Sequence, residues 1–176
     1  YVRRIRLYNP KYIYGYLSSL YAFASLMLKE NIRIGIKLTA VVTTSETLHN
    51  FQRQVIEKAF ECTLSNEYGA RDGGIIAYTC SHGRMHISAE NMIFETVDVI
   101  TQNPVKPGEM GAVLVTDLNN LVMPRIRYKL GDLAVISQTS CDCGINLPVI
   151  EKLQGREDDI FLGKDGTLVH SEYFTY

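Results

Sequence analysis

Three of the four cysteines and two nearby histidines are the side chains best suited to hold a metal ion. Cys141 and Cys143 are one residue apart, and Cys80 is followed by His82 and His86. Three thiolates and one imidazole would complete a closed tetrahedral zinc set, with no open position for a catalytic water. We predict a structural zinc site of Cys80, His86, Cys141 and Cys143, with His82 as the alternative histidine. The other interpretation is a set of buried or free thiols, because this spacing is less specific than paired Cys-x-x-Cys motifs.

A glycine-rich segment, residues 66–74, is the first candidate for binding a small molecule. Its glycines let the backbone approach a ligand closely, and the ring of Tyr68 offers a flat surface for stacking. The carboxylates of Glu67 and Asp72 are ligands that a hard divalent cation prefers. The alternative is an ordinary turn between two strands.

Two later segments place a charged side chain beside a glycine. Gly131 allows a sharp bend that presents the carboxylate of Asp132, which can accept both hydroxyls of a ribose. Gly155 precedes Arg156, a fixed cation suited to an anion, and the acidic run that follows suggests a flexible joint. The alternatives are a surface strand that ends in a turn aspartate and a solvated loop.

The elements that must position these residues begin with residues 10–65. Helical apolar spacing alternates there with a β-branched run, which predicts helix, strand, helix and strand in a partial α/β layer. The first helix is expected to start at Asn9-Pro10, and the strand to cover residues 37–42. Thr43 and Glu46 have capping-box spacing before the second helix.

The spacing of the apolar residues changes after residue 74. Short alternating or β-branched runs separated by turn signals predict a mostly antiparallel β subdomain, so the predicted fold class is α/β followed by β. The runs are residues 75–78, 92–100, 112–116, 125–128 and 133–137. Residues 160–162 and 167–169 flank a glycine-bounded turn and predict a hairpin.

Length and charge limit the function classes. The chain has 176 residues, 18 of them basic and 19 acidic, and a net charge of -1. This balance gives no broad electrostatic surface for nucleic acid or an anionic membrane. The sequence has no secretory signal or apolar stretch of membrane-spanning length, and its cysteines are too few for a disulfide scaffold. We therefore expect a cytoplasmic protein with neither nucleic acid nor membrane as a partner.

The order of these motifs resembles the adenylate-forming enzymes of the phenylacetate–CoA ligase type, including the capsular-polysaccharide (CapK-type) proteins. The resemblance covers nearly the whole chain, and it is specific because six motifs occur in order with similar spacing. The matching segments are residues 43–48, 66–69, 108–111, 123–132, 141–144 and 155–159.

The resemblance implies a two-step ligase. A carboxylate attacks the α-phosphate of ATP to give an acyl-adenylate and pyrophosphate, and a thiol, usually that of coenzyme A, then takes the acyl group. The implied ligands are ATP or AMP, Mg²⁺, coenzyme A and a small carboxylate substrate, and a homodimer is left open. The competing hypothesis is a non-catalytic, zinc-stabilised remnant that serves as a binding module.

The resemblance also implies catalytic roles for three residues. Ser45 and Glu46 would belong to a loop that borders the acyl and phosphate site. Asp158 would be the hinge about which a small C-terminal domain turns between the two half-reactions.

The nucleotide-binding residues are implied in the same way. Glu67, Tyr68 and Gly69 would lie along adenine, with Tyr68 stacking on it. Asp132 would bind the ribose hydroxyls, and Arg156 would contact the ribose or a phosphate.

Two departures from the family pattern accompany the resemblance. The family usually has glutamate as its magnesium ligand where this sequence has Asp72, whose arm is shorter by one methylene. The phosphate-binding loop and the catalytic lysine of the family have no counterpart, so we expect part of a longer enzyme that is inactive by itself. The expected division is an α/β part (1–74), a β-rich part with the zinc site (75–154), and the hinge with the start of the next domain (155–176).

Overall fold

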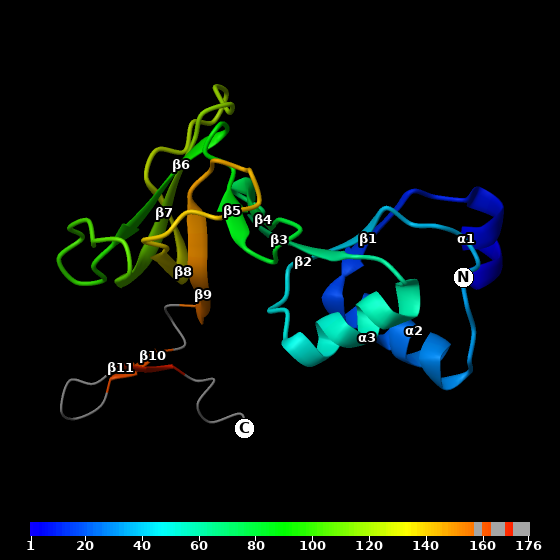
Figure 1. The fold of residues 1–176 in the computed structure, drawn as a ribbon. Helices are drawn as coiled ribbons and strands as arrows, with labels where there is room; N and C mark the ends of the chain where they lie inside the picture. The colour runs from blue at the N-terminus through cyan, green and yellow to red at the C-terminus, as the bar shows by residue number, and fades with distance from the viewer. Residues whose placement is uncertain (157–159, 163–167, 171–176) are drawn as a thin grey trace. The chain divides into compact units, whose positions relative to one another are not determined.

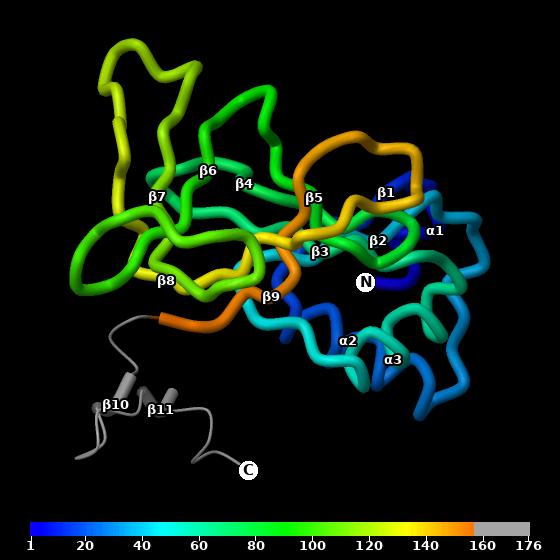
Figure 2. The backbone as a smooth tube through the Cα atoms, turned by 60° about the vertical axis from the view of Figure 1, so that its left-hand side comes forward, coloured from blue at the N-terminus to red at the C-terminus, as the bar shows by residue number. Residues whose placement is uncertain are grey.

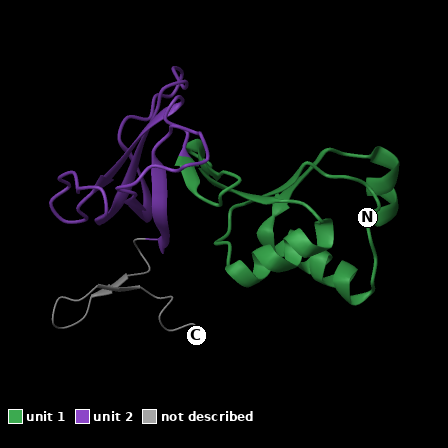
Figure 3. Cartoon of the chain, viewed as in Figure 1, with its two compact units in different colours: residues 1–86 green, residues 87–176 purple. Residues whose placement is uncertain are grey.

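The computed structural model describes residues 1–156, 160–162 and 168–170 (Figure 1). The chain divides into two compact units, unit 1 (Tyr1–His86) and unit 2 (Ile87–Tyr176) (Figure 3). The division falls after His86 rather than at residue 74, because the strand that follows residue 74 pairs within unit 1. The predicted hinge residue, Asp158, lies outside the described residues.

Unit 1 is built around three parallel strands joined by helical crossovers. Strands β1, β2 and β3 are parallel, and β4 pairs with β3 in the antiparallel direction. Helices α2 and α3 lie side by side against this sheet (Figure 1, Figure 2). The elements are α1 (Val2–Tyr8), β1 (Tyr12–Tyr16), α2 (Leu17–Lys29), β2 (Ala40–Thr44), α3 (Asn50–Phe60), β3 (Leu64–Ala70) and β4 (Gly74–Thr79).

The core of unit 1 lies between the two helices and one face of the sheet. Val41 and Leu64 are cross-strand partners on this face and are 0% and 1% exposed. Leu17 and Met27 of α2 and Phe60 of α3 belong to the same buried cluster. The expected α/β layer is therefore confirmed, and burial of these apolar side chains holds its helices on the sheet.

The starts of both predicted helices are wrong. The first begins at Leu17 rather than at Asn9-Pro10, because Tyr12–Tyr16 form β1. The alternating tyrosines of that segment fit a strand with one open face. Thr43 is inside β2, and the helix that follows starts at Asn50, where the Gln52 side chain accepts a hydrogen bond from the His49 N–H at 3.1 Å.

Unit 2 is antiparallel, as the sequence predicted, although the strand at Val149–Arg156 was not expected. β7 pairs with both β6 and β8, and β8 pairs with β9, all in the antiparallel direction. The predicted hairpin is also confirmed, because β10 pairs with β11. The expected strand at residues 125–128 is wrong except for its last residue, since Arg127 has a left-handed backbone with φ of 50°. The elements are β5 (Met85–Ile87), at the division, then β6 (Met92–Val97), β7 (Met110–Asp117), β8 (Tyr128–Ile136), β9 (Val149–Arg156), β10 (Ile160–Leu162) and β11 (Leu168–His170).

No helix within the described ranges combines the length and the hydrophobicity that crossing a membrane requires.

Asp98 organises the turn that follows β6. Its Oδ1 accepts hydrogen bonds from the Thr101 N–H at 2.7 Å, the Thr101 hydroxyl at 2.9 Å and the Ile100 N–H at 3.0 Å. The Thr101 backbone N–H, followed by its hydroxyl and the Ile100 N–H, lowers the pKa of Asp98 below its ordinary value.

This pKa shift predicts a pH-dependent contribution to folding. Because the folded-state pKa is lowered, the stabilisation is present above the unfolded pKa of 3.8 and is lost as the pH falls through the folded value. Asp98→Ala should therefore lower the free energy of unfolding near neutral pH, and its difference from the parent should shrink on acidification. Urea titrations of both proteins across this range measure the difference. An Asp98→Ala defect that does not change with pH would contradict the prediction, and Glu90→Ala is an exposed control.

Candidate functional site

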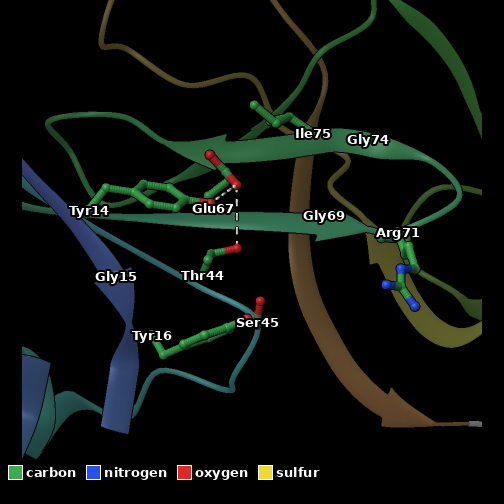
Figure 4. A pocket seen from close by; sticks show the side chains of 11 residues that line it. Tyr14, Gly15, Tyr16, Thr44, Ser45, Glu67, Gly69, Arg71, Gly74 and Ile75 are labelled. Atoms are coloured by element: carbon green, nitrogen blue, oxygen red, sulfur yellow. Dashed lines mark hydrogen bonds between the residues drawn. The ribbon is translucent and has the colours of Figure 1, made fainter. Parts of the chain in front are cut away.

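A pocket of unit 1 lies at the carboxyl ends of its parallel strands, where α/β sheets commonly bind ligands. Its volume is about 520 Å³, within the range of small-molecule sites. It is open on the side of the sheet away from the buried core, and side chains from β1, β2 and β3 line it (Figure 4). The lining residues are Tyr14, Gly15, Tyr16, Thr44, Ser45, Glu67, Gly69, Ala70, Arg71, Gly74 and Ile75.

The carboxylate of Glu67 is held at the centre of this pocket by two hydroxyls (Figure 4). Its Oε1 accepts a hydrogen bond from the Tyr14 hydroxyl at 3.0 Å and one from the Thr44 hydroxyl at 3.4 Å. The hydrogen bond to Glu67 raises the pKa of Tyr14, because the phenol donates to a carboxylate. The pocket therefore presents an anchored carboxylate.

Ser45 lines the same pocket, but Glu46 turns to the start of α2. The carboxylate of Glu46 accepts hydrogen bonds from the Ser18 N–H at 3.0 Å and the Ser18 hydroxyl at 2.8 Å. Ser18 is in the first turn of the helix, where N–H groups have no partner within the helix and an anion is favoured. Ser45 has a left-handed backbone with φ of 73°, which a non-glycine residue adopts at a cost. Glu46 thus ties the strained Ser45 turn to α2.

Glu46→Ala should destabilise the protein because it removes both hydrogen bonds at the start of α2. We expect a loss of about 1 kcal/mol in the free energy of unfolding, since the pair is exposed to solvent. Urea denaturation of the intact protein measures it. Ser19→Ala, one residue along the same helix turn, is the matched control. Equal stability of the Glu46→Ala and parent proteins would show that the contact contributes nothing.

The side chains of Tyr68 and Glu67 lie on opposite sides of β3, because successive side chains of a strand alternate between its two faces. Tyr68 is 9% exposed and belongs to the buried side of the strand, as does Asn66, whereas Glu67 faces the pocket. Asn66 is paired with the fully buried Thr43 of β2. Within the part of the chain that the structure describes, Asn66 Oδ1 and Thr43 Oγ1 are buried without a hydrogen-bond partner. Buried polar atoms usually have a hydrogen-bond partner, so each of these two oxygens could accept a hydrogen bond.

Gly69 and Asp72 lie at the junction of β3 and β4. A Cβ atom on Gly69 would come within 2.9 Å of the Gly74 carbonyl oxygen, so a side chain there would displace the backbone. This close approach, at a β-bulge between Tyr68 and Gly69, explains the need for glycine. Asp72, the predicted magnesium ligand, is half-buried in the turn between the strands.

In unit 2, Asp132 and Arg156 are brought together. They are cross-strand partners on β8 and β9, and Arg156 Nη1 lies 3.7 Å from Asp132 Oδ1. Gly131 has φ of +79° and precedes a β-bulge at Asp132, which orients the carboxylate as the sequence predicted. One side of unit 2 thus carries an adjacent carboxylate and guanidinium.

Unit 1 contains two of the four predicted zinc ligands. Cys80 follows β4 and begins a tight turn, in which its N–H donates to the Arg84 carbonyl and its own carbonyl accepts from the Gly83 N–H, both at 2.9 Å. His86 is fully buried on β5, whereas His82 is exposed in the turn. A structural metal ligand is expected to be buried, which favours His86.

Unit 2 contains the other two ligands, Cys141 and Cys143, in the loop between β8 and β9. Both are half-buried and form no disulfide, and the Ile145 N–H donates a hydrogen bond to Cys143 Sγ at 3.4 Å. Gly144 has φ of +87°, which allows the turn that directs this N–H at the sulfur. An N–H donor stabilises a thiolate, the form of cysteine that binds metal.

The chain is similar to known proteins in sequence and in fold. No family model matches the chain. Protein CapK of Staphylococcus aureus is 25% identical over 177 residues, which cover 96% of this chain and 36% of CapK. The phenylacetate–coenzyme A ligase of Thermus thermophilus is 28% identical over 114 residues, which cover 62% of this chain and 26% of the ligase.

A solved structure of 2-hydroxyisobutyryl-CoA ligase, in complex with 2-HIB-AMP and CoA, has the same fold. Its TM-score is 0.83 at 20% identity, over 96% of this chain and 41% of that one. The chain is thus similar in sequence to CapK and to a phenylacetate–CoA ligase, and it shares the fold of an acyl-CoA ligase. The chain spans about a third of the length of the curated relatives it matches.

Several residues of the pocket were missed by reasoning from the sequence. Tyr14 and Thr44 contact Glu67, and Arg71 lines the pocket beyond the end of β3. The alternating tyrosines at residues 12–16 were the signal for β1, and the rule that ligands bind at the ends of parallel strands would then have indicated Tyr14 and Thr44.

Proposed function

We propose that the intact protein activates a carboxylic acid with ATP. The carboxylate oxygen attacks the α-phosphorus and pyrophosphate leaves, which gives an acyl-adenylate. The thiol of coenzyme A then attacks the acyl carbon, and AMP leaves. The sequence relatives that are ligases favour this enzyme over a non-catalytic binding module.

The observation that carries the proposal is the pairing of Asp132 with Arg156 in unit 2. A carboxylate can accept the two hydroxyls of a ribose, and an adjacent guanidinium can bind the phosphate attached to it. Two sequence segments that the resemblance assigned to the nucleotide thus supply complementary groups at one place.

Two residues on the buried side of β3 have groups that could bind adenine. Tyr68 offers an aromatic ring, and Asn66 Oδ1 on the same side of the strand is a buried acceptor without a partner among the described residues. An exocyclic amine is a donor of the kind that this oxygen can accept. We infer that Asn66 and Tyr68 contact the base, that Ser45 borders the acyl group, and that Asp158 acts as the hinge.

Asp72 is proposed as the residue that binds Mg²⁺ beside the nucleotide phosphates. Its carboxylate has the oxygen donors that Mg²⁺ prefers, and bound Mg²⁺ would offset the negative charge of pyrophosphate as it leaves. We also propose a cytoplasmic location, in keeping with cysteines that form no disulfide bond, because a reducing compartment disfavours disulfides.

A structural zinc ion is proposed at Cys80, His86, Cys141 and Cys143. Support comes from the donor set, from the turns at Cys80 and Gly144, and from the N–H donor to Cys143 Sγ. Four protein ligands would close the coordination shell, so the ion would contribute to folding rather than to the reaction.

Carboxylate-dependent exchange of labelled pyrophosphate into ATP tests the proposed activity in the intact protein. Exchange that requires both a carboxylic acid and Mg²⁺ is the expected result, because formation of the acyl-adenylate is reversible. Absence of exchange across a panel of aryl and aliphatic acids, in protein that is folded by circular dichroism, would contradict the proposal.

A further inference from the structure

The pocket of unit 1 carries a negative charge whose hydrogen bonds, among the described residues, come from neutral groups. The Tyr14 and Thr44 hydroxyls both donate to Oε1 of Glu67. Hydroxyl donors add no positive charge to balance a carboxylate, whereas a paired arginine or lysine would. Figure 4 shows its second oxygen turned away from both donors. Glu67 is therefore placed to bind a cationic group of a ligand.

A group of opposite charge lines the same pocket. Arg71 lies beyond the end of β3, on the far side of Gly69 from Glu67 in Figure 4. The aromatic ring of Tyr16 and the side chain of Ile75 supply apolar surface in the same pocket. A ligand with an ammonium at one end and a negative group at the other, separated by an apolar body, matches this distribution of charge.

We propose that this pocket selects a carboxylic acid that carries a protonated amino group, with the ammonium on Glu67 and the carboxylate end directed toward Arg71. The inference rests on the proposed function, because the selected acid is the one that would be adenylated. Tyr14 and Thr44 are positioning residues that hold the carboxylate of Glu67 in place. A pocket built to pair with a polar group of the substrate rejects an analogue that lacks the group, because its own charge is then left unpaired.

The test compares acids that differ only at the proposed ammonium. A series of ω-amino acids of increasing length and aminomethyl-substituted aryl acids is assayed by pyrophosphate exchange with the intact protein. Each acid is paired with its methyl and hydroxymethyl isosteres. We expect kcat/KM for the best amino acid to exceed that of its methyl isostere by about tenfold or more. A methyl or hydroxymethyl acid that is preferred would overturn the inference.

Glu67→Gln keeps the size of the side chain and the acceptor for Tyr14 but removes the charge. The preference for the amino acid over its methyl isostere should fall to about onefold. Glu61→Gln, an exposed carboxylate at the end of α3, is the control and should keep the preference. A preference that survives Glu67→Gln would overturn the assignment.

Tyr14→Phe is the second variant, and it keeps the inference testable if Glu67→Gln does not fold. It leaves the charge in place but frees the carboxylate to move, so KM for the amino acid should rise while a preference remains. Direct binding, measured by ligand-observed NMR, separates the two proposals. Binding of the amino acid that depends on Glu67, without exchange, would contradict the ligase proposal alone. Exchange only with acids that lack the amino group would contradict this inference alone.

Discussion

Chelation of the purified intact protein is expected to release about one zinc ion per chain and to lower its thermal stability sharply. Structural zinc binds small domains with about 10–16 kcal/mol at neutral pH, and this binding energy contributes directly to folding. The proposed ligands are two cysteines of one loop, Cys141 and Cys143, together with Cys80 and His86. All four would bind the metal through deprotonated groups, so zinc binding should weaken on acidification.

Substitution of a single ligand gives the sharper test. Cys143→Ser should reduce the zinc content to less than a tenth of that of the parent protein and lower the midpoint of thermal unfolding. Cys62→Ser is the matched control, because Cys62 is also half-buried but packs at the edge of the unit 1 core. The zinc content must be measured on protein that has not been exposed to a chelator. If the parent protein then carries under a tenth of a zinc ion per chain, these four residues are free thiols.

Asp132→Ala is expected to weaken binding of AMP to the intact protein by about 1–3 kcal/mol, through the loss of two hydroxyl contacts. The side chain of Asp132 is 18% exposed and adjoins Arg156, so removal of the carboxylate also leaves the guanidinium without its neighbour. The rest of β8 and β9 should stay paired, because their pairing is through the backbone.

Isothermal titration calorimetry with AMP measures this loss directly. Glu151→Ala, an exposed residue on the same strand as Arg156, is the control and should bind as the parent does. Arg156→Ala should also weaken AMP, and by more than it weakens adenosine, because the proposed partner of the arginine is the phosphate. Unchanged affinity of Asp132→Ala for AMP would exclude Asp132 from the ribose site.

The fold class could be predicted because hydrophobic periodicity is a local property of the chain. The α/β layer, the antiparallel β subdomain and the hairpin of β10 and β11 were all expected and are present. The boundaries were less predictable. Asn9-Pro10 is a strong helix-start signal, yet the segment after it pairs with β2, because Tyr12–Tyr16 gain backbone hydrogen bonds from a strand about 30 residues away in sequence.

The motif order indicated the resemblance to the ligases and predicted that Asp132 and Arg156 bind one nucleotide. The structure makes these two residues cross-strand partners on β8 and β9. The sequence alone could not show that Glu67 and Tyr68, neighbours in one motif, have side chains on opposite sides of a strand. Side chains alternate along β3, so Tyr68 is buried on one side of the strand while Glu67 lines the pocket on the other.

The sequence by itself determined which chemical groups this protein has: the zinc-type ligands, the carboxylate and arginine proposed for the nucleotide, and the alternation of helix and strand. Only the tertiary structure decided which groups share a site. Tyr14 and Glu67 are 53 residues apart in sequence, and their hydrogen bond exists because two helical crossovers place β1, β2 and β3 side by side. The spacing of residues along the chain indicates whether a segment is a helix or a strand. It does not show which strands end next to one another in the sheet.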